Sequence, residues 1–393
     1  MRRRALELVT LIIAVMVGYG IAVVVAPGVV APSENPTPGA RTTAETTTTA
    51  ASPGSTTSVV SRPETYLVWS TGGLTPELTA GLEDRFEQLS VVRGDVVEMD
   101  SGEGLVVPLD ALAIDPDAHA SFDPDGSLTP LLPGTVALGE TSAGFRRLTL
   151  GDGLSIGGAT YEIVAIVPDS VVGAAEVVFS KSDQSSPIVT DRFALVATDL
   201  DRNEFEDVVR DMYDGPAPLR IRTQDETPWL RHGDAVLPQI FIKTALGEFG
   251  YGERSGSGFT QEPEFVGDNI VEATVPILGE VTCHAEVVDM LSGAMAQLVD
   301  QGLSHLVDRA GYAGCWNPRY IRSTTGTTAG ISRHAWGAAV DINAATNPVG
   351  SAGTQDPRLV EVLLDWGFTW GGDWLVPDPM HFEYGKSPEP KGV

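Results

Sequence analysis

Two short stretches near the end of the 393-residue chain carry the side chains best suited to chemistry. The first contains His334 and Asp341, and the second contains Asp378 and His381. Two neutral imidazoles and a hard carboxylate suit Zn²⁺, and three protein ligands leave a fourth position open for water, as catalytic zinc requires. The residue types therefore predict a catalytic metal centre.

The first stretch has the pattern of a turn followed by a strand. Gly337, just after Trp336, offers a turn where a side chain would obstruct. Residues 339–342, Ala-Val-Asp-Ile, alternate small or apolar with polar side chains, which is typical of a strand whose polar side faces a site. His334 and Asp341 can therefore converge although seven residues separate them.

A helix is expected in front of the second stretch. It begins at Pro357, with Asp356 as an N-cap acid, and it ends at Gly367. Its apolar face consists of Leu359, Val360, Leu363 and Leu364. A Trp- and Gly-rich segment then leads to Asp378, and an acid three residues before a histidine indicates more than a packed loop.

A longer amphipathic helix is expected over residues 285–301. Its buried face consists of Val287, Val288, Leu291, Met295 and Leu298. His284 and His305, near its two ends, are expected to be structural or solvent-facing rather than ligands.

Cys283 and Cys315 are the only cysteines. In an exported chain we expect them to form a disulfide, which stabilises the fold by roughly 3–4 kcal/mol on the loop-entropy model. Two buried thiols or zinc ligation are the alternatives. Ligation by cysteine is disfavoured because the two sulfurs lack the close spacing of a ligand pair.

Three motifs in this region carry a family resemblance. They are Ser-x-His-x-x-Gly-x-Ala-x-Asp at 332–341, Gly-Phe-x-Trp-Gly-Gly-x-Trp at 367–374 and Asp-x-x-His-Phe-Glu at 378–383. Together they resemble the zinc D,D-carboxypeptidase and L-alanyl-D-glutamate endopeptidase family, which includes vancomycin-resistance dipeptidases and phage endolysins. The likeness covers roughly the last 110 residues.

The resemblance implies roles for individual residues. His334, Asp341 and His381 would bind Zn²⁺, and Asp378 would be the general base. Some relatives have glutamate where this chain has Asp378, and the aspartate is more like the endopeptidase branch. Relatives also place an oxyanion-stabilising arginine upstream of the histidine motif. Arg319 is our candidate, with Arg322 in reserve, because the local sequence departs from the usual Gly-Tyr-Arg-Ser form.

The part of the chain before this region has a different character. Short β-branched runs at 66–69, 96–99, 161–167 and 193–197 predict strands, and residues 76–89 and 204–213 predict helices. These elements suggest an α+β domain that ends near Ile221. Within it, residues 137–140 and 148–158, with a Gly-Asp turn, resemble the extracytoplasmic core domain of macrolide-exporter-type ABC permeases.

This middle domain shows no catalytic constellation. His119 stands alone in an Asp- and Pro-rich loop and is expected to be a solvated loop residue. The resemblance leaves room for a protein partner in the cell envelope. Between this domain and the helix at 285–301, residues 250–260 are rich in Gly and Ser and are expected to form a loop.

The start of the chain indicates export. Arg2, Arg3 and Arg4 precede an apolar run from Leu8 to about Ala26, which is long enough to span a bilayer. We expect a retained single-pass membrane anchor, and a cleaved signal peptide is the alternative. Residues 32–63 are rich in Thr, Ser, Pro and Ala, and a disordered stalk is expected there.

The composition limits which classes of fold and partner remain. The formal net charge of −28 argues against a nucleic-acid partner, and 42% apolar residues indicates a globular fold. We expect four segments, at 1–31, 32–63, 64–221 and 222–393, with a small antiparallel sheet in the α+β peptidase domain. The expected function is a membrane-anchored, extracytoplasmic zinc peptidase acting on peptidoglycan stem peptides. A non-catalytic wall-peptide-binding or envelope-complex accessory protein is the alternative.

Overall fold

The computed structural model describes residues 63–226, 229–230, 233–321 and 330–386. The expected anchor at 1–31 and all of the expected stalk except Pro63 lie outside the described residues, as does Arg322. In the part of the chain that is described, no helix is both long and apolar enough to cross a membrane.

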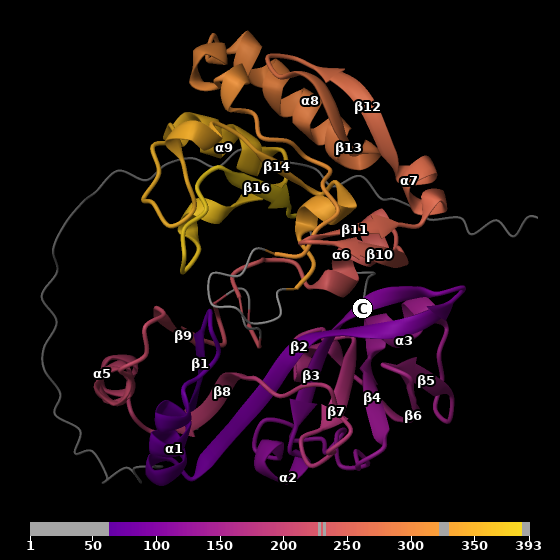
Figure 1. Ribbon diagram of the computed structural model, residues 1–393. Helices are drawn as coiled ribbons and strands as arrows, with labels where there is room; N and C mark the ends of the chain where they lie inside the picture. Colours follow the sequence, from indigo (N-terminus) through magenta and orange to yellow (C-terminus); the bar gives the residue numbers. More distant parts are fainter. Residues whose placement is uncertain (1–62, 227–228, 231–232, 322–329, 387–393) are drawn as a thin grey trace, which may run out of the picture. The chain divides into compact units, whose positions relative to one another are not determined.

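The fold is of the expected α+β class, with one large sheet and two small ones. Eleven strands form the large sheet in the order β11-β10-β3-β7-β4-β6-β5-β2-β8-β1-β9 (Figure 1). Its strands are β1 (Glu64–Ser70), β2 (Gln88–Gly102), β3 (Leu105–Ile114), β4 (Thr135–Gly139), β5 (Gly153–Ile156), β6 (Ala159–Val167), β7 (Val177–Ser180), β8 (Asp191–Thr198), β9 (Leu219–Thr223), β10 (Tyr251–Ser255) and β11 (Gly258–Gln261). The four β-branched runs singled out in the sequence all lie in these strands.

Pairing in the large sheet is mixed. β3 pairs with β7 in parallel, and β4 pairs with β6 in parallel. The other described pairs are antiparallel, with the long β2 joining β3 and β8. The helices of this part are α1 (Pro76–Arg85), α2 (Pro116–His119), α3 (Glu140–Arg146), α4 (Asp169–Val172), α5 (Arg202–Met212) and α6 (Gln239–Leu246).

The two predicted helices of the middle domain exist, and their ends are set by capping. α1 begins at Pro76 behind the cap Thr75, and it stops at Arg85 because Phe86 turns extended and is buried. α5 begins two residues earlier than expected because Asp201 forms a capping box with Glu204. Local cap chemistry, rather than the apolar period, therefore decides the ends.

The prediction of a loop at 250–260 is wrong. The segment is the β10–β11 hairpin, whose Tyr251 and Phe259 are buried with their rings 4.5 Å apart. Gly256, with φ of 61°, lies in the turn between the strands. The glycines and serines therefore build a hairpin around two buried aromatic residues.

The expectation for His119 is also wrong. Its side chain is 2% exposed, and Nδ1 lies 2.8 Å from Ser90 Oγ. The one-turn helix α2, capped by Asp115, places it against β2, with the Phe122 ring 5.7 Å away. Burial lowers the pKa of His119 from 6.5 to about 4.

This buried histidine predicts a loss of stability in acid. Its pKa is lower in the folded chain, so below pH 6.5 the unfolded chain binds the proton first and stability falls as pH falls toward 4. Between pH 7.5 and 5.0 this group should remove about 2 kcal/mol from the free energy of unfolding. Denaturant unfolding of the wild type and of His119→Asn, which can keep the bond to Ser90, measures the difference. Equal pH dependence in the two proteins would contradict the prediction.

The C-terminal part builds its own core around two helices. Its helices are α7 (Pro263–Asn269), α8 (Ala285–Asp300) and α9 (Pro357–Asp365), and single 3₁₀ turns are η1 (Ser304–Leu306), η2 (Arg309–Gly311), η3 (Arg333–Trp336), η4 (Ala344–Thr346) and η5 (Gly371–Asp373). The strands are β12 (Ile270–Val275), β13 (Gly279–His284), β14 (Ala339–Asp341), β15 (Phe368–Trp370) and β16 (His381–Tyr384). α8 lies along the β12–β13 hairpin (Figure 1). Helices 285–301 and 357–366 thus exist almost as predicted.

A disulfide joins β13 to the segment after α8. Cys283 and Cys315 are bonded, and their Cα atoms are 5.3 Å apart. Both cysteines are buried in the core formed by α8, α9 and the three-stranded sheet. The predicted pairing is therefore present, and it attaches the segment that leads toward the histidine motif.

A buried ion-pair network joins the large sheet to α6. Lys243 Nζ lies 2.8 Å from Glu176 Oε2, and both side chains are fully buried. Gln239 donates to the other Glu176 oxygen at 2.8 Å, and Arg146 pairs with both Glu176 and Glu248. Removing one side of a buried pair leaves an uncompensated charge. Fragments that start after residue 222 would lack Glu176, so experiments on this protein are best done with the whole chain.

Candidate metal centre

The three-stranded sheet β14-β16-β15 places two of the candidate ligands opposite each other. In the antiparallel β14–β16 pair, Asp341 faces His381 directly, and Ala339 faces Glu383. Alternation sends Val340 and Phe382 to the other side, where both are fully buried in the core with α8 and α9. The apolar residues of each strand therefore hold the sheet down while its polar face carries the site.

His334 reaches the same place from the 3₁₀ turn η3. Ser332 caps this turn by accepting a hydrogen bond from the His334 amide at 3.4 Å. Gly337 ends the turn with φ of 62°, and a Cβ there would lie 2.5 Å from the backbone nitrogen of His284. Glycine is therefore required between His334 and the strand that bears Asp341.

The ring of His334 is held in one tautomer. Nδ1 lies 2.7 Å from the Cys315 carbonyl oxygen, which only accepts, so Nδ1 carries the proton. Nε2 is left with a lone pair, buried and without a hydrogen-bond partner. The disulfide between Cys315 and Cys283 anchors the residue that orients this ring.

The three side chains converge on one point. His334 Nε2 lies 3.3 Å from Asp341 Oδ1, and His381 Nδ1 lies 3.1 Å from the same oxygen. One ligand atom from each residue lies within 4.8 Å of the other two. A buried nitrogen with a free lone pair, a second imidazole and a carboxylate form a donor set that fits Zn²⁺.

His381 has a partner on its other nitrogen. Nε2 lies 3.3 Å from Glu383 Oε2, and Glu383 is 2% exposed. Without a metal, burial lowers the pKa of His381, but hydrogen bonds to Asp341 and Glu383 raise it more strongly, to about 10. Although burial opposes it, the adjacent His334 and His381 rings hold the pKa of Asp341 below its usual value. A carboxylate behind a histidine ligand is the arrangement that orients the ring toward a metal.

Glu383 is part of the candidate site, although we assigned it no role from the sequence. It lies two residues after His381, and strand periodicity alone would have placed the two side chains on one face. Replacing Glu383 by glutamine should weaken zinc binding by about 10- to 100-fold, because the orienting partner loses its charge. Competition with a chromogenic chelator measures the affinity.

A matched control for that variant lies on α9. Glu361 is exposed, and Glu361→Gln removes one negative charge without touching the site. Zinc affinity equal to that of the wild type is expected for Glu361→Gln. The same result for Glu383→Gln would contradict the role given to Glu383.

Asp378 lies beside the three ligands on the loop between η5 and β16. Its amide donates to the Gly371 carbonyl at 2.8 Å, and its own carbonyl accepts from the His381 amide at 3.0 Å. Oδ1 of Asp378 is buried and has no hydrogen-bond partner. Burial raises the pKa of this carboxyl, the nearby Asp341 charge adds to that rise, and His381 opposes it. A raised pKa suits a carboxylate that accepts a proton from water.

Gly371 allows this loop to fold. A Cβ at Gly371 would lie 2.6 Å from the Asp378 carbonyl oxygen and 3.3 Å from the His381 Cβ. Trp374, later in the loop, has its ring 5.1 Å from the His381 ring. The Gly-Gly-x-Trp motif thus provides close backbone packing and an aromatic wall for one ligand.

Arg319 is the candidate arginine in the described part of the chain. Its guanidinium Nη1 donates to the Tyr320 carbonyl at 3.4 Å, and its carbonyl accepts from the Ser332 amide at 3.1 Å. Its charge lies close enough to Asp378 to lower the pKa of that carboxyl slightly against the effect of burial. Position therefore supports Arg319, while Arg322 lies outside the described residues.

Two other histidines in the described part of this region, His284 and His305, are not part of the cluster. His284 caps α8, because its Nδ1 accepts from the Glu286 amide, and its Nε2 contacts the Leu246 carbonyl. His305 lies exposed in η1. Tyr312 lies near Asp341, which the sequence did not indicate. Burial and the Asp341 charge raise the pKa of Tyr312 to about 12.

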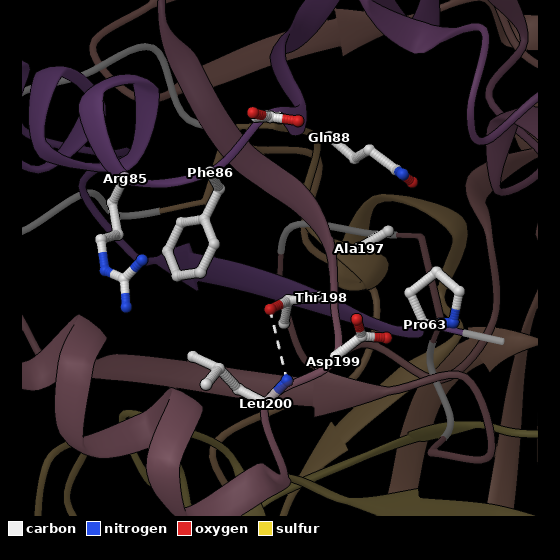
Figure 2. Close-up of a pocket in the computed structure, with 9 residues that line it drawn as sticks. Pro63, Arg85, Phe86, Gln88, Ala197, Thr198, Asp199 and Leu200 are labelled. Atoms are coloured by element: carbon white, nitrogen blue, oxygen red, sulfur yellow. Dashed lines mark hydrogen bonds between the residues drawn. The ribbon is translucent and has the colours of Figure 1, made fainter. Parts of the chain in front are cut away.

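A separate pocket of about 510 Å³ lies where the described chain begins. Figure 2 shows its lining, in which the Leu200 amide donates to Thr198 Oγ1 at 3.3 Å. The lining consists of Pro63, Arg85, Phe86, Glu87, Gln88, Ala197, Thr198, Asp199 and Leu200. Its lining includes the carboxylates of Glu87 and Asp199 but no histidine, so it lacks the two imidazoles found at the candidate metal centre.

Comparisons with known proteins give one family match and some weakly similar solved structures. No curated protein matches the chain. Two solved structures are similar to part of it at 10% sequence identity. The periplasmic region of MacB from Actinobacillus actinomycetemcomitans has a TM-score of 0.30, with 41% of this chain and 89% of that chain covered. The extracellular domain of the noncanonic ABC-type transporter YknZ from Gram-positive bacteria has a TM-score of 0.29, with 41% and 100% covered.

The family match concerns the metal centre itself. Residues 325–384 match a peptidase family described as D-alanyl-D-alanine carboxypeptidase. His334, Asp341, Asp378 and His381 all lie inside the matched segment, and Arg319 lies just before it. The resemblance predicted from the three motifs is confirmed: the C-terminal segment is similar to the D-alanyl-D-alanine carboxypeptidase family, which makes its function peptidase-like.

Proposed function

We propose that this protein is a membrane-anchored, extracytoplasmic zinc peptidase that hydrolyses bonds in the stem peptides of peptidoglycan. The observation that carries the proposal is the convergence of His334, Asp341 and His381 beside the buried, unpaired oxygen of Asp378. A structural metal site is closed by protein ligands and has no need of a buried base next to it. A site with three ligands and an adjacent carboxylate is suited to hydrolysis.

The roles of the side chains follow from amide hydrolysis. Zinc, when bound, polarises the scissile carbonyl and lowers the pKa of a bound water. Asp378 takes the proton of the attacking water and returns it to the leaving amine, and its raised pKa makes it a better proton acceptor. Arg319 offsets the negative charge that develops on the carbonyl oxygen. Glu383 keeps the His381 ring turned toward Asp341.

The test is cleavage of defined muropeptides by the full-length protein purified in detergent, with and without a zinc chelator. Mass spectrometry of the products distinguishes loss of a C-terminal D-alanine from cleavage between L-alanine and D-glutamate. The aspartate at position 378 favours the second product, since it is more like the endopeptidase branch. Absence of chelator-sensitive cleavage of every muropeptide would overturn the proposal.

Membrane anchoring is the part of the proposal that rests on the first 31 residues. Three arginines before a long apolar run favour an anchor with the arginines inside and the rest of the chain outside. Fractionation of expressing cells, followed by protease treatment of intact spheroplasts, tests this topology. Recovery of the chain in the membrane fraction and its digestion from outside are expected. Protection from the protease would contradict it.

A further inference from the structure

The loop that carries the base is hydrogen-bonded to residues far away in the sequence. The amide of Leu375 donates to Asp234 Oδ2 at 2.6 Å, and Arg220 Nη2 donates to the Asp373 carbonyl at 3.3 Å. Asp373 and Leu375 lie between Gly371 and Asp378, the two ends of this loop. The loop is therefore held by side chains from β9 and from the segment that follows it.

Asp234 is itself held tightly. Its Oδ1 accepts from Arg220 Nη1 at 2.5 Å and from Arg222 Nη2 at 2.8 Å. The side chain of Asp234 is 8% exposed and that of Arg222 is 3% exposed. Arg222 also donates to the Gly233 carbonyl at 2.8 Å and lies over the Trp69 ring at 5.0 Å. Arg220, Arg222 and Asp234 are here called the Asp234 cluster. Arg222 and Asp234 are buried and Arg220 is partly exposed, and the two arginines lie on β9, the edge strand of the large sheet.

The side chain of Leu375 adds an apolar contact to these hydrogen bonds. It packs against the large-sheet core that contains Leu67 and Trp69, as Trp229 and Leu230 also do. An apolar side chain and two hydrogen bonds on one short loop restrict both its position and its rotation. The hydrogen bond from the Leu375 amide goes to the charged carboxylate of Asp234, and such hydrogen bonds are stronger than those between neutral groups.

The held loop is the one that shapes the metal centre. Trp374, next to Leu375, has its ring 5.1 Å from the His381 ring. Asp378 is tied to Gly371 across the same loop by a 2.8 Å backbone hydrogen bond. A shift of residues 373–375 would therefore move both the aromatic wall of a ligand and the carboxylate of the base.

We propose that Asp234 is a positioning residue for the peptidase site, holding the loop 371–378 so that Asp378 stays at the reacting water. The catalytic part of this inference rests on the proposed function. The structural part, that Asp234 holds the loop, rests on the hydrogen bonds alone. Misplacing a catalytic group by about 1 Å costs on the order of 100-fold in rate. The segment between β9 and α6 thereby contributes to catalysis without contributing a catalytic residue.

The test compares Asp234→Ala with Arg202→Ala in the full-length protein. Arg202 lines the same pocket of about 430 Å³ as Arg220, but its ion pairs go to Glu206 and Glu226. For Asp234→Ala we expect amide exchange in the peptide spanning 371–380 to speed up by about tenfold. We also expect kcat to fall by about 10- to 100-fold, with KM changed less than about twofold and zinc still bound. Arg202→Ala should match the wild type in all four measurements.

Two further points keep the outcome decisive. If Asp234→Ala fails to fold, Asp234→Asn carries the comparison, because its NH₂ group cannot accept and the side chain must lose either the Leu375 bond or the two arginine bonds. Unchanged exchange in the loop overturns the proposal whatever the activity, and so does faster exchange with an unchanged kcat. A wild type that cleaves no stem peptide refutes the proposed function, while the exchange comparison still decides whether Asp234 holds the loop.

Discussion

Replacing Asp378 by asparagine is expected to lower kcat by about 100- to 10,000-fold and to leave zinc bound. Asparagine has nearly the same shape, so the backbone hydrogen bonds of the loop to Gly371 and His381 can persist. The amide oxygen is a poor proton acceptor at neutral pH, so water loses its base. KM should change little because Asp378 acts on the water rather than on the peptide.

The measurements are steady-state kinetics on the muropeptide that the wild type cleaves, together with the zinc content of each protein. Asp365→Asn, on the exposed side of α9, is the matched control and should behave as the wild type. Near-normal turnover of Asp378→Asn with zinc bound would refute the assignment of Asp378 as the base. Loss of zinc from Asp378→Asn would instead show that this residue belongs to the ligand set.

Much of the backbone around the candidate metal centre could be predicted because local patterns specify it. Strand alternation around Asp341 and the obligatory turn at Gly337 are properties of neighbouring residues, and both are present in the structure. The start of α9 was predicted for the same reason, since an acid and a proline set it. The arrangement of the ligands themselves came from the family resemblance rather than from spacing.

Long-range burial is what the sequence could not reveal. His119 has a polar neighbourhood in sequence, yet packing against β2 removes it from water. The hairpin at 251–261 has a loop-like composition, and only its contacts with buried aromatic residues make it a sheet element. Local composition measures the preference of a segment in isolation, and tertiary packing overrides it in both cases.

The contact between Asp234 and the loop of the candidate site also has no local signal. Asp234 and Leu375 are 141 residues apart, and no repeat or spacing rule joins them. The same holds for Glu98 on β2, which accepts from the Tyr320 hydroxyl at 3.4 Å next to Arg319. Contacts from the large sheet thus reach the segments on both sides of the metal centre. The contact of Glu98 with Tyr320 joins the expected segments 64–221 and 222–393.

Replacing His334 by alanine is expected to empty the metal centre. The variant removes one of three protein ligands, so zinc affinity should fall by at least about 1,000-fold. This loss is larger than the 10- to 100-fold expected when only a hydrogen-bond partner of a ligand is replaced. Activity should be lost with it. His305→Ala is the matched control, because His305 is an exposed histidine outside the cluster. Full zinc occupancy in His334→Ala would contradict the ligand assignment.

Thermal unfolding gives a measurement of the same ligand set that does not depend on activity. Zinc at 100 times its dissociation constant should stabilise the wild type by about 2.7 kcal/mol, since it binds the folded chain. His305→Ala should gain the same stability, whereas His334→Ala should gain almost none at that zinc concentration. The lone pair on His334 Nε2, buried and unpaired without a metal, is the physical reason. An equal rise in Tm for His334→Ala would mean that zinc stabilises the chain at some other site, and the geometry of His334, Asp341 and His381 would then need another explanation.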